Sequence, residues 1–291
     1  MLRGHAFYLL DNLFDSEESY INALRIKPAP KDPILQERLG IVYAKRQSWT
    51  DAKTVFLKVC KEKVSTNAWY YLGLSLLRLG ELEASEDAIS QANILDNQDA
   101  SIWGLNAILC LKYGKQRLPQ AKFCMKEALR LGLKDTALLE EIADLFEHEG
   151  LLAESARLYE TVSSLIQSEQ ETAQAEHAQK RDRAASEEKQ QSIAACEEKM
   201  LKLLDEKHGI ILQKLGNIYC NEKLDKGGDA HNVELAIEHF KRAIDLVKGD
   251  SNKTNIALTL QTLLTRQNRA FEMAPYKQYL PDGNQSDAGF E

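Results

Sequence analysis

Carboxylate side chains are concentrated between positions 140 and 149 of the sequence. The cluster consists of Glu140, Glu141, Asp144, Glu147 and Glu149. Two carboxylates held close together can act as general acid and general base, provided that burial shifts their pKa values apart. These residues have the polar spacing of a solvent-exposed helix face. We therefore expect a charged surface here and no acid–base site.

Histidine and cysteine are too scattered to indicate a metal site or a catalytic nucleophile. The histidines lie at positions 5, 148, 177, 208, 231 and 239, and the cysteines at 60, 110, 124, 196 and 220. No two cysteines are spaced as C-x-x-C, and His231 and His239 lie eight positions apart, which is a weak ligand spacing. Motifs for nucleophile elbows, phosphate loops, dinucleotides and zinc proteases are also absent from the sequence. We predict a protein that is not an enzyme and needs no metal, cofactor or small-molecule substrate. The competing hypothesis is a hydrolase or transferase with an unusual site.

The composition predicts a helical protein of the cytoplasm. Hydrophobic residues make up 44% and charged residues 28%, which is ordinary for a globular chain. Six prolines and fifteen glycines in 291 residues favour helices over sheets and turns. The net charge of −7 argues against a nucleic-acid partner. The sequence has no apolar run of about 18 residues and no secretory leader pattern, so neither membrane insertion nor secretion is expected.

The helices that carry these residues follow a repeat that is clearest at Trp69–Gly73. The sequence there reads Trp-Tyr-Tyr-Leu-Gly, followed by Leu76, by Gly80 at a turn, and by Ala92 nineteen positions after the first glycine. This pattern resembles a tetratricopeptide repeat, a helix-turn-helix unit of about 34 residues. The resemblance implies an all-α, right-handed superhelical solenoid that serves as a binding scaffold.

In this register the template predicts about six helix pairs. Five units occupy residues 1–164, and the first starts inside its opening helix, as expected of a fragment of a longer protein or of a short isoform. The fourth unit needs two extra residues near Lys115–Arg117. The sixth unit, with an insertion at Lys223–Asn232 and a capping helix, occupies residues 208–274, and residues 275–291 are predicted to be a mobile tail. The alternative fold is an unrelated bundle of amphipathic helices.

A charged helical spacer is predicted at residues 165–207, between the fifth and sixth units. Residues 151–208 contain no glycine or proline, and residues 167–192 lack Val, Ile, Leu, Met and aromatic residues. Ala, Glu, Gln, Lys and Arg favour helices, but this stretch has no apolar stripe to bury. We expect two elongated helices, of coiled-coil type, with a solvated or frayed middle. The alternative is a disordered linker.

The repeat resemblance also predicts a groove, because the first helix of each unit lines the concave surface in such proteins. The groove residues carried over in this way are Tyr70, Leu74, Leu77, Ile108, Leu111, Glu140, Asp144 and Glu147. The apolar members would bind an amphipathic helix or apolar segment of a partner protein, and the acidic members would favour Lys or Arg at one end of it. Two alternatives are that neighbouring helices already cover the apolar residues, and that the spacer is the contact surface.

The third and fourth units are similar to a more specific family. Tyr71 to Asn93, with Trp103 and Leu109–Lys112, resembles the C-terminal repeat region of a cilia- and flagella-associated protein of the axonemal central apparatus. The likeness covers about residues 30 to 160 and implies a structural component of the axonemal cytoskeleton. The alternative is a cytosolic co-chaperone or adaptor that presents a client peptide. Chaperone-binding relatives use a Lys/Asn/Arg clamp, and this groove has Arg78 nearby without a cluster of Lys and Asn.

Overall fold

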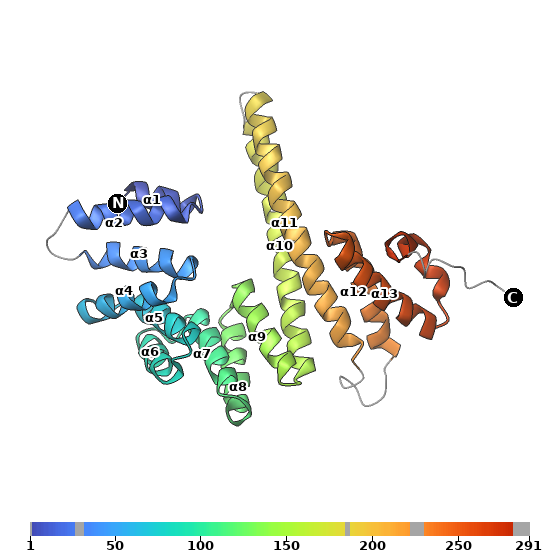
Figure 1. Cartoon of the computed structure of the whole chain (residues 1–291), viewed down its shortest axis with the longest axis horizontal. Coiled ribbons are helices and arrows are strands. Elements are labelled where there is room, and N and C mark those ends of the chain that lie inside the picture. The colour runs from blue at the N-terminus through green and yellow to red at the C-terminus, as the bar shows by residue number, and fades with distance from the viewer. Residues whose placement is uncertain (1, 27–31, 184–186, 222–229, 282–291) are drawn as a thin grey trace. The chain divides into compact units, whose positions relative to one another are not determined.

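The structure, a computed structural model, describes residues 2–26, 32–183, 187–221 and 230–281 (Figure 1). All regular elements of these residues are helices, and the chain divides into two compact units, Met1–Leu138 and Leu139–Glu291. The helices of the first unit are α1 (Leu2–Leu9), α2 (Leu13–Ile26), α3 (Pro33–Lys45), α4 (Trp49–Glu62), α5 (Thr66–Arg78), α6 (Leu82–Leu95), α7 (Ala100–Lys112), the 3-10 helix η1 (Lys115–Arg117) and α8 (Leu118–Arg130). Helix α9 (Thr136–His148) spans the boundary, and the second unit continues with α10 (Leu152–Arg183), α11 (Glu187–Tyr219), α12 (Ala230–Leu246), α13 (Asp250–Arg266) and the 3-10 helix η2 (Ala270–Tyr279).

Capping residues set the starts of α3, α5 and α7, the first helices of three consecutive repeats. Asp32, Ser65 and Asp99 accept hydrogen bonds from the free backbone N–H groups at the starts of α3, α5 and α7. At the other ends of α5 and α7, Gly80 and Gly114 have φ angles of +79° and +83°, a region that glycine enters without strain. The chain therefore reverses tightly into the second helix of each pair. Helix η1 takes up the two extra residues predicted for the fourth repeat.

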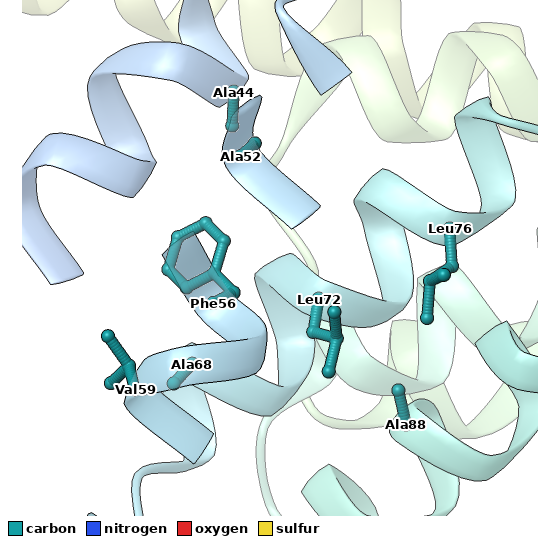
Figure 2. Packing of buried hydrophobic residues seen from close by; sticks show 8 residues of the cluster. All are labelled: Ala44, Ala52, Phe56, Val59, Ala68, Leu72, Leu76 and Ala88. Carbon is teal, nitrogen blue, oxygen red and sulfur yellow. The ribbon is translucent and has the colours of Figure 1, made fainter. Parts of the chain in front are cut away.

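Small residues let the two helices of a pair approach, and large residues fill the space between neighbouring pairs. A Cβ atom at Gly40 in α3 would lie 2.7 Å from the ring of Phe56 in α4, and one at Gly4 in α1 would lie 2.8 Å from the ring of Tyr20 in α2. Phe56 belongs to a buried cluster that joins α3, α4, α5 and α6 (Figure 2). The cluster consists of Ala44, Ala52, Phe56, Val59, Ala68, Leu72, Leu76 and Ala88. One pair thus completes its core with side chains of the next, as a stacked repeat requires.

The second unit is built on two long helices, α10 and α11, of 32 and 33 residues. They lie side by side (Figure 1) and are buried against each other at their base, where Val162 and Ile166 of α10 and Ile211 and Leu215 of α11 are inaccessible to solvent. Of the predicted spacer, residues 165–183 lie in α10 and residues 187–207 lie in α11. Helix α12 packs on α11, and α13 packs on α12 as the predicted cap.

The prediction of a mobile tail from Pro275 is wrong for residues 275–280. Helix η2 continues to Tyr279, Met273 and Leu280 are buried, and the Lys253 ammonium lies 4.9 Å from the centre of the Tyr279 ring. Burial of these two apolar side chains offsets the ordering of a proline-containing segment. Residues 282–291 of the predicted tail and residues 223–229 of the predicted insertion lie outside the described residues.

Candidate protein-interaction surface

The inner surface of the first unit is formed by α3, α5 and α7, which contact one another in sequence order. On this surface Tyr70 and Leu74 of α5 are half-buried and Ile34 of α3 is exposed. The Tyr70 ring packs edge-on against Tyr71, with centroids 5.2 Å apart, and Tyr71 stacks on Phe56 at 5.4 Å. These stacked rings restrain Tyr70, so that it presents a pre-ordered apolar surface.

The hydroxyl of Tyr70 lies in an acidic environment. Burial, followed by the nearby Tyr71 hydroxyl and the carboxylates of Asp135 and Asp99, raises the pKa of Tyr70. The phenol therefore stays neutral and can donate a hydrogen bond. Both carboxylates are helix caps: Asp99 accepts from Ser101 N at 2.8 Å, and Asp135 caps α9. This part of the surface combines an apolar ring with hydrogen-bonding groups.

The other three apolar groove residues, Leu77, Ile108 and Leu111, are buried within the first unit. The side chains of Leu133 and Leu138 fill the space beside Gly104 of α7. A Cβ atom at Gly104 would lie 2.5 Å from the Leu138 side chain and 3.1 Å from that of Leu133. The alternative that neighbouring side chains cover the groove therefore holds for these three residues. Partner binding at Tyr70 and Leu74 stays a prediction.

The three acidic groove residues belong to the part of α9 that lies in the second unit, and Lys214 of α11 contacts two of them. Its Nζ donates hydrogen bonds to Asp144 Oδ1 at 2.7 Å and to Glu140 Oε1 at 3.1 Å. The same Nζ lies 5.2 Å from the centre of the Tyr159 ring, and the Tyr159 hydroxyl donates to Asp144. A cation of the chain itself thus occupies the place that the sequence assigned to a Lys or Arg of a partner.

The pKa shifts show that this acidic cluster is partly desolvated. Burial lowers the pKa of Lys214, but its hydrogen bonds to Asp144 and Glu140 outweigh burial and leave that pKa raised. Burial and the hydrogen bond to Asp144 raise the pKa of Tyr159. Burial and the Asp144 carboxylate also raise the pKa of Glu147. Lys214 therefore stays charged and Tyr159 neutral, and together with the two carboxylates they tie α9, α10 and α11 together.

Sequence reasoning missed Lys214 and Tyr159 as partners of the acidic residues. Lys214 lies 70 residues beyond Asp144, on the far side of the spacer, so no local spacing relates the two. The repeat register could have predicted the contact between Lys214 and Asp144. Both residues fall on the first helices of consecutive repeats, and such helices are neighbours in a stacked array.

Two further findings concern possible metal ligands and membrane-spanning helices among the described residues. No group of three or more His, Cys, Asp and Glu residues there could hold a metal ion. His231 is exposed, whereas His239 stacks on the Tyr219 ring with centroids 5.7 Å apart. None of the helices within residues 2–281 that the structure describes is both long and apolar enough to cross a membrane.

Known proteins resemble this chain both in sequence and in fold. The family model for the cilia and flagella-associated protein 70 C-terminal domain matches residues 1–223. The chain is 35% identical over 150 residues to cilia- and flagella-associated protein 70 of Homo sapiens, a match that covers 51% of this chain and 13% of the human protein. The protein of the same name from Macaca fascicularis is 41% identical over 113 residues, or 39% of this chain and 11% of that protein. The chain therefore corresponds to a small part of each relative's length.

Solved structures are similar to this chain at low sequence identity. A chain of the APC/C hetero-tetramer Cut9–Hcn1 is 14% identical with a TM-score of 0.51, covering 92% of this chain and 44% of that chain. A tetratricopeptide protein of Thermus thermophilus is 17% identical with a TM-score of 0.48, covering 56% of this chain and 87% of that chain. The all-α repeat fold predicted from the sequence is confirmed.

Proposed function

The chain belongs to the family of the cilia and flagella-associated protein 70 C-terminal domain, and we propose that it is a non-catalytic, protein-binding scaffold in a ciliary or flagellar assembly. Stacked helix pairs offer an extended inner surface whose side chains can vary without disturbing the core, which suits binding better than catalysis. The family and the named relatives support the ciliary setting. Within the cilium or flagellum, we propose that the chain is a component of the axonemal cytoskeleton.

The observation that carries the binding proposal is the uncovered apolar part of the first unit's inner surface. Ile34 is exposed, and Ile41, Tyr70 and Leu74 are only partly buried on adjacent first helices. An amphipathic helix or apolar segment of a partner protein would gain affinity by removing water from these side chains, at about 25 cal/mol per Å² before ordering costs. The Tyr70 hydroxyl and nearby cap carboxylates would orient the polar edge of the segment.

The acidic residues of α9 have a different role in this proposal. Because Lys214 already pairs with Glu140 and Asp144, we assign these residues to holding α9 against α11. A Lys or Arg of a partner would have to displace an internal cation to bind there, which reduces any net gain. The partner segment is therefore assigned to the first unit.

Localisation separates this function from that of a cytosolic adaptor. The tagged chain is expressed in ciliated cells, and its distribution is compared before and after detergent extraction. Retention along the axoneme after extraction supports the scaffold. A diffuse cytosolic distribution, with a chaperone co-purifying, would instead support the adaptor that presents a client peptide.

A second experiment distinguishes the inner surface from the long helices as the contact site. Residues 172–197 are deleted and replaced by a short turn, which shortens α10 and α11 and keeps the hydrogen bond between Gln170 and Asp205. Axonemal retention is expected to stay within about two-fold of wild type. Loss of retention on this deletion would assign partner binding to the charged helices instead.

A further inference from the structure

Helix α8 and the segments on either side of it form a strongly basic stretch in an acidic chain. Residues 112–134 contain seven lysine or arginine residues and one carboxylate, Glu127, which gives a net charge of +6, whereas the whole chain has −7. Two of the seven pair with carboxylates, Arg130 with Glu127 at 2.9 Å and Arg117 with Glu86 of α6 at 2.7 Å. Most of the positive charge is therefore not balanced within the stretch.

Three of the cations lie along the solvent-facing side of α8. Lys122, Lys126 and Arg130 follow one another at four-residue spacing, and all three are exposed. Because successive residues of an α-helix are separated by about 100°, they fall within an arc of about 80°. This arc faces away from the buried side of the helix, which carries Ala121, Cys124, Met125 and Ala128. Like charges at this spacing destabilise a helix, so carboxylates of a partner would relieve an existing repulsion.

An exposed aromatic ring lies on the same face. Phe123 is 56% exposed and lies about 20° from Arg130 around the helix axis. Its ring packs edge-on against Trp103 of α7, with centroids 6.0 Å apart. The Trp103 indole N–H donates a 2.9 Å hydrogen bond to the backbone carbonyl oxygen of Asn97, which restrains the ring pair. The cationic face therefore includes a pre-ordered apolar contact.

The repeat fold does not require this cationic face. Ala121 of α8 and Ser85 of α6 are the equivalent buried small residues of their repeats. In this register the three cations of α8 correspond to Glu86, Ser90 and Ile94. The second helix of the preceding repeat thus carries one acidic, one polar and one apolar residue at the same positions. Packing within a helix pair does not account for the positive charge, whereas an anionic partner does.

We propose that the solvent-facing side of α8 binds an acidic amphipathic helix of another protein. Glu or Asp side chains one turn apart on that helix would face Lys122, Lys126 and Arg130, which are themselves one turn apart, and an apolar side chain would contact Phe123. The rest of the chain has a net charge of −13, which would repel a nucleic acid that extends beyond this face. Because α8 is the second helix of its pair, this surface is separate from the inner surface formed by α3, α5 and α7.

Fluorescence anisotropy of a labelled model peptide with the whole 291-residue chain, at low salt, tests the proposal. The peptide is an Ala/Leu helix of about five turns with Glu at i,i+4 spacing. Lys122→Glu with Lys126→Glu is expected to weaken binding at least about ten-fold, and Phe123→Ser about three-fold. The matched control is Lys58→Glu with Lys61→Glu, which makes the same charge change at exposed positions of α4. This control is expected to bind within about two-fold of wild type.

A single-stranded oligonucleotide of the same negative charge distinguishes recognition of a protein helix from attraction of any polyanion. It is expected to bind at least about ten-fold more weakly than the peptide. Circular dichroism checks that each variant keeps its helices, and Lys122→Gln with Lys126→Gln replaces the charge reversal if the latter unfolds. A wild-type chain that does not bind the peptide at about 100 µM would overturn the proposal. An equal loss of binding in the α4 control, or an oligonucleotide that binds as tightly as the peptide, would overturn it as well.

Discussion

The hydroxyl of Ser85 in α6 donates a 2.8 Å hydrogen bond to the backbone carbonyl oxygen of Gly73 in α5. Ser16 makes the same 2.8 Å bond to Gly4, also across twelve residues. In both pairs the glycine lets the second helix come close enough for a serine hydroxyl to reach the first helix. The small residues of the repeat therefore do more than avoid a clash, because they connect the two helices of a pair directly.

Ser85→Ala is expected to destabilise the first unit by about 1 kcal/mol, because a buried hydrogen bond is lost. Ser155 is buried at the equivalent position of α10, but its hydroxyl has no hydrogen-bond partner among the described residues. Ser155→Ala is expected to be neutral or stabilising, within about 0.5 kcal/mol. Urea unfolding followed by circular dichroism measures both changes. The control is Ser90→Ala on the exposed face of α6, and equal losses at Ser85 and Ser155 would contradict this account.

Lys214→Met is expected to destabilise the second unit by about 1 kcal/mol at low salt, a figure discounted because Lys214 is partly solvent-accessible. The substitution leaves Glu140 and Asp144 close together without their shared cation. Hydrogen exchange of α9 and α11 measures the effect, and Asp144→Asn in the same chain should restore part of the protection. Lys202→Met, which breaks an exposed pair with Glu198 on α11, is the control and should have a smaller effect than Lys214→Met. Equal effects at the two lysines would show that Lys214 makes no special contribution.

The stability of the second unit is expected to fall as the pH decreases from about 7 to about 5.5. Burial, followed by the Arg242 charge, lowers the pKa of His208 against the opposing attraction of Asp205. Burial also lowers the pKa of His239. Because the unfolded chain binds these protons more readily, stability is complete above the ordinary histidine pKa of 6.5 and is lost below it. Glu147, whose pKa is raised by burial and by the Asp144 carboxylate, acts in the opposite sense.

Unfolding midpoints at pH 7.5 and 5.5, measured by circular dichroism, test this dependence on wild type and on His208→Gln. Tryptophan fluorescence would miss it, since Trp49, Trp69 and Trp103 all lie in the first unit. The Gln variant keeps a polar group near Ser163, which lies 2.8 Å from His208 Nε2. It is expected to show a smaller pH dependence. An identical dependence in the variant would remove His208 from this account.

The thiols of Cys60 and Cys220 are expected to react slowly in the folded protein. Burial raises the pKa of Cys60 to about 12 and that of Cys220 to about 11. Timed alkylation at pH 8, followed by mass spectrometry of the peptides, should show both residues modified at least about ten-fold more slowly than in urea. Rapid modification of either thiol in the folded chain would show that its helix pair opens readily.

The fold could be predicted because the repeat is encoded locally. Glycine is required at position 73 by the close approach of two helices and at position 80 by a positive φ angle. The same requirements recur about every 34 residues. The site could be predicted only in part. Tyr70 and Leu74 are placed by their own helix, but the burial of Ile108 depends on packing that its own helix does not determine. The contact of Lys214 with Asp144 depends on how the chain returns after the spacer, which local spacing cannot show.

Axonemal retention of inner-surface variants tests the central claim most directly. The detergent-resistant fraction of the tagged chain in ciliated cells is measured for wild type, for Ile34→Asp combined with Leu74→Asp, and for the exposed control Ile94→Asp on α6. We predict that the double variant keeps its helical content and loses at least about ten-fold in retention, whereas the control is retained like wild type. Retention of the double variant at the wild-type level would contradict the assignment of the partner to the inner surface of the first unit.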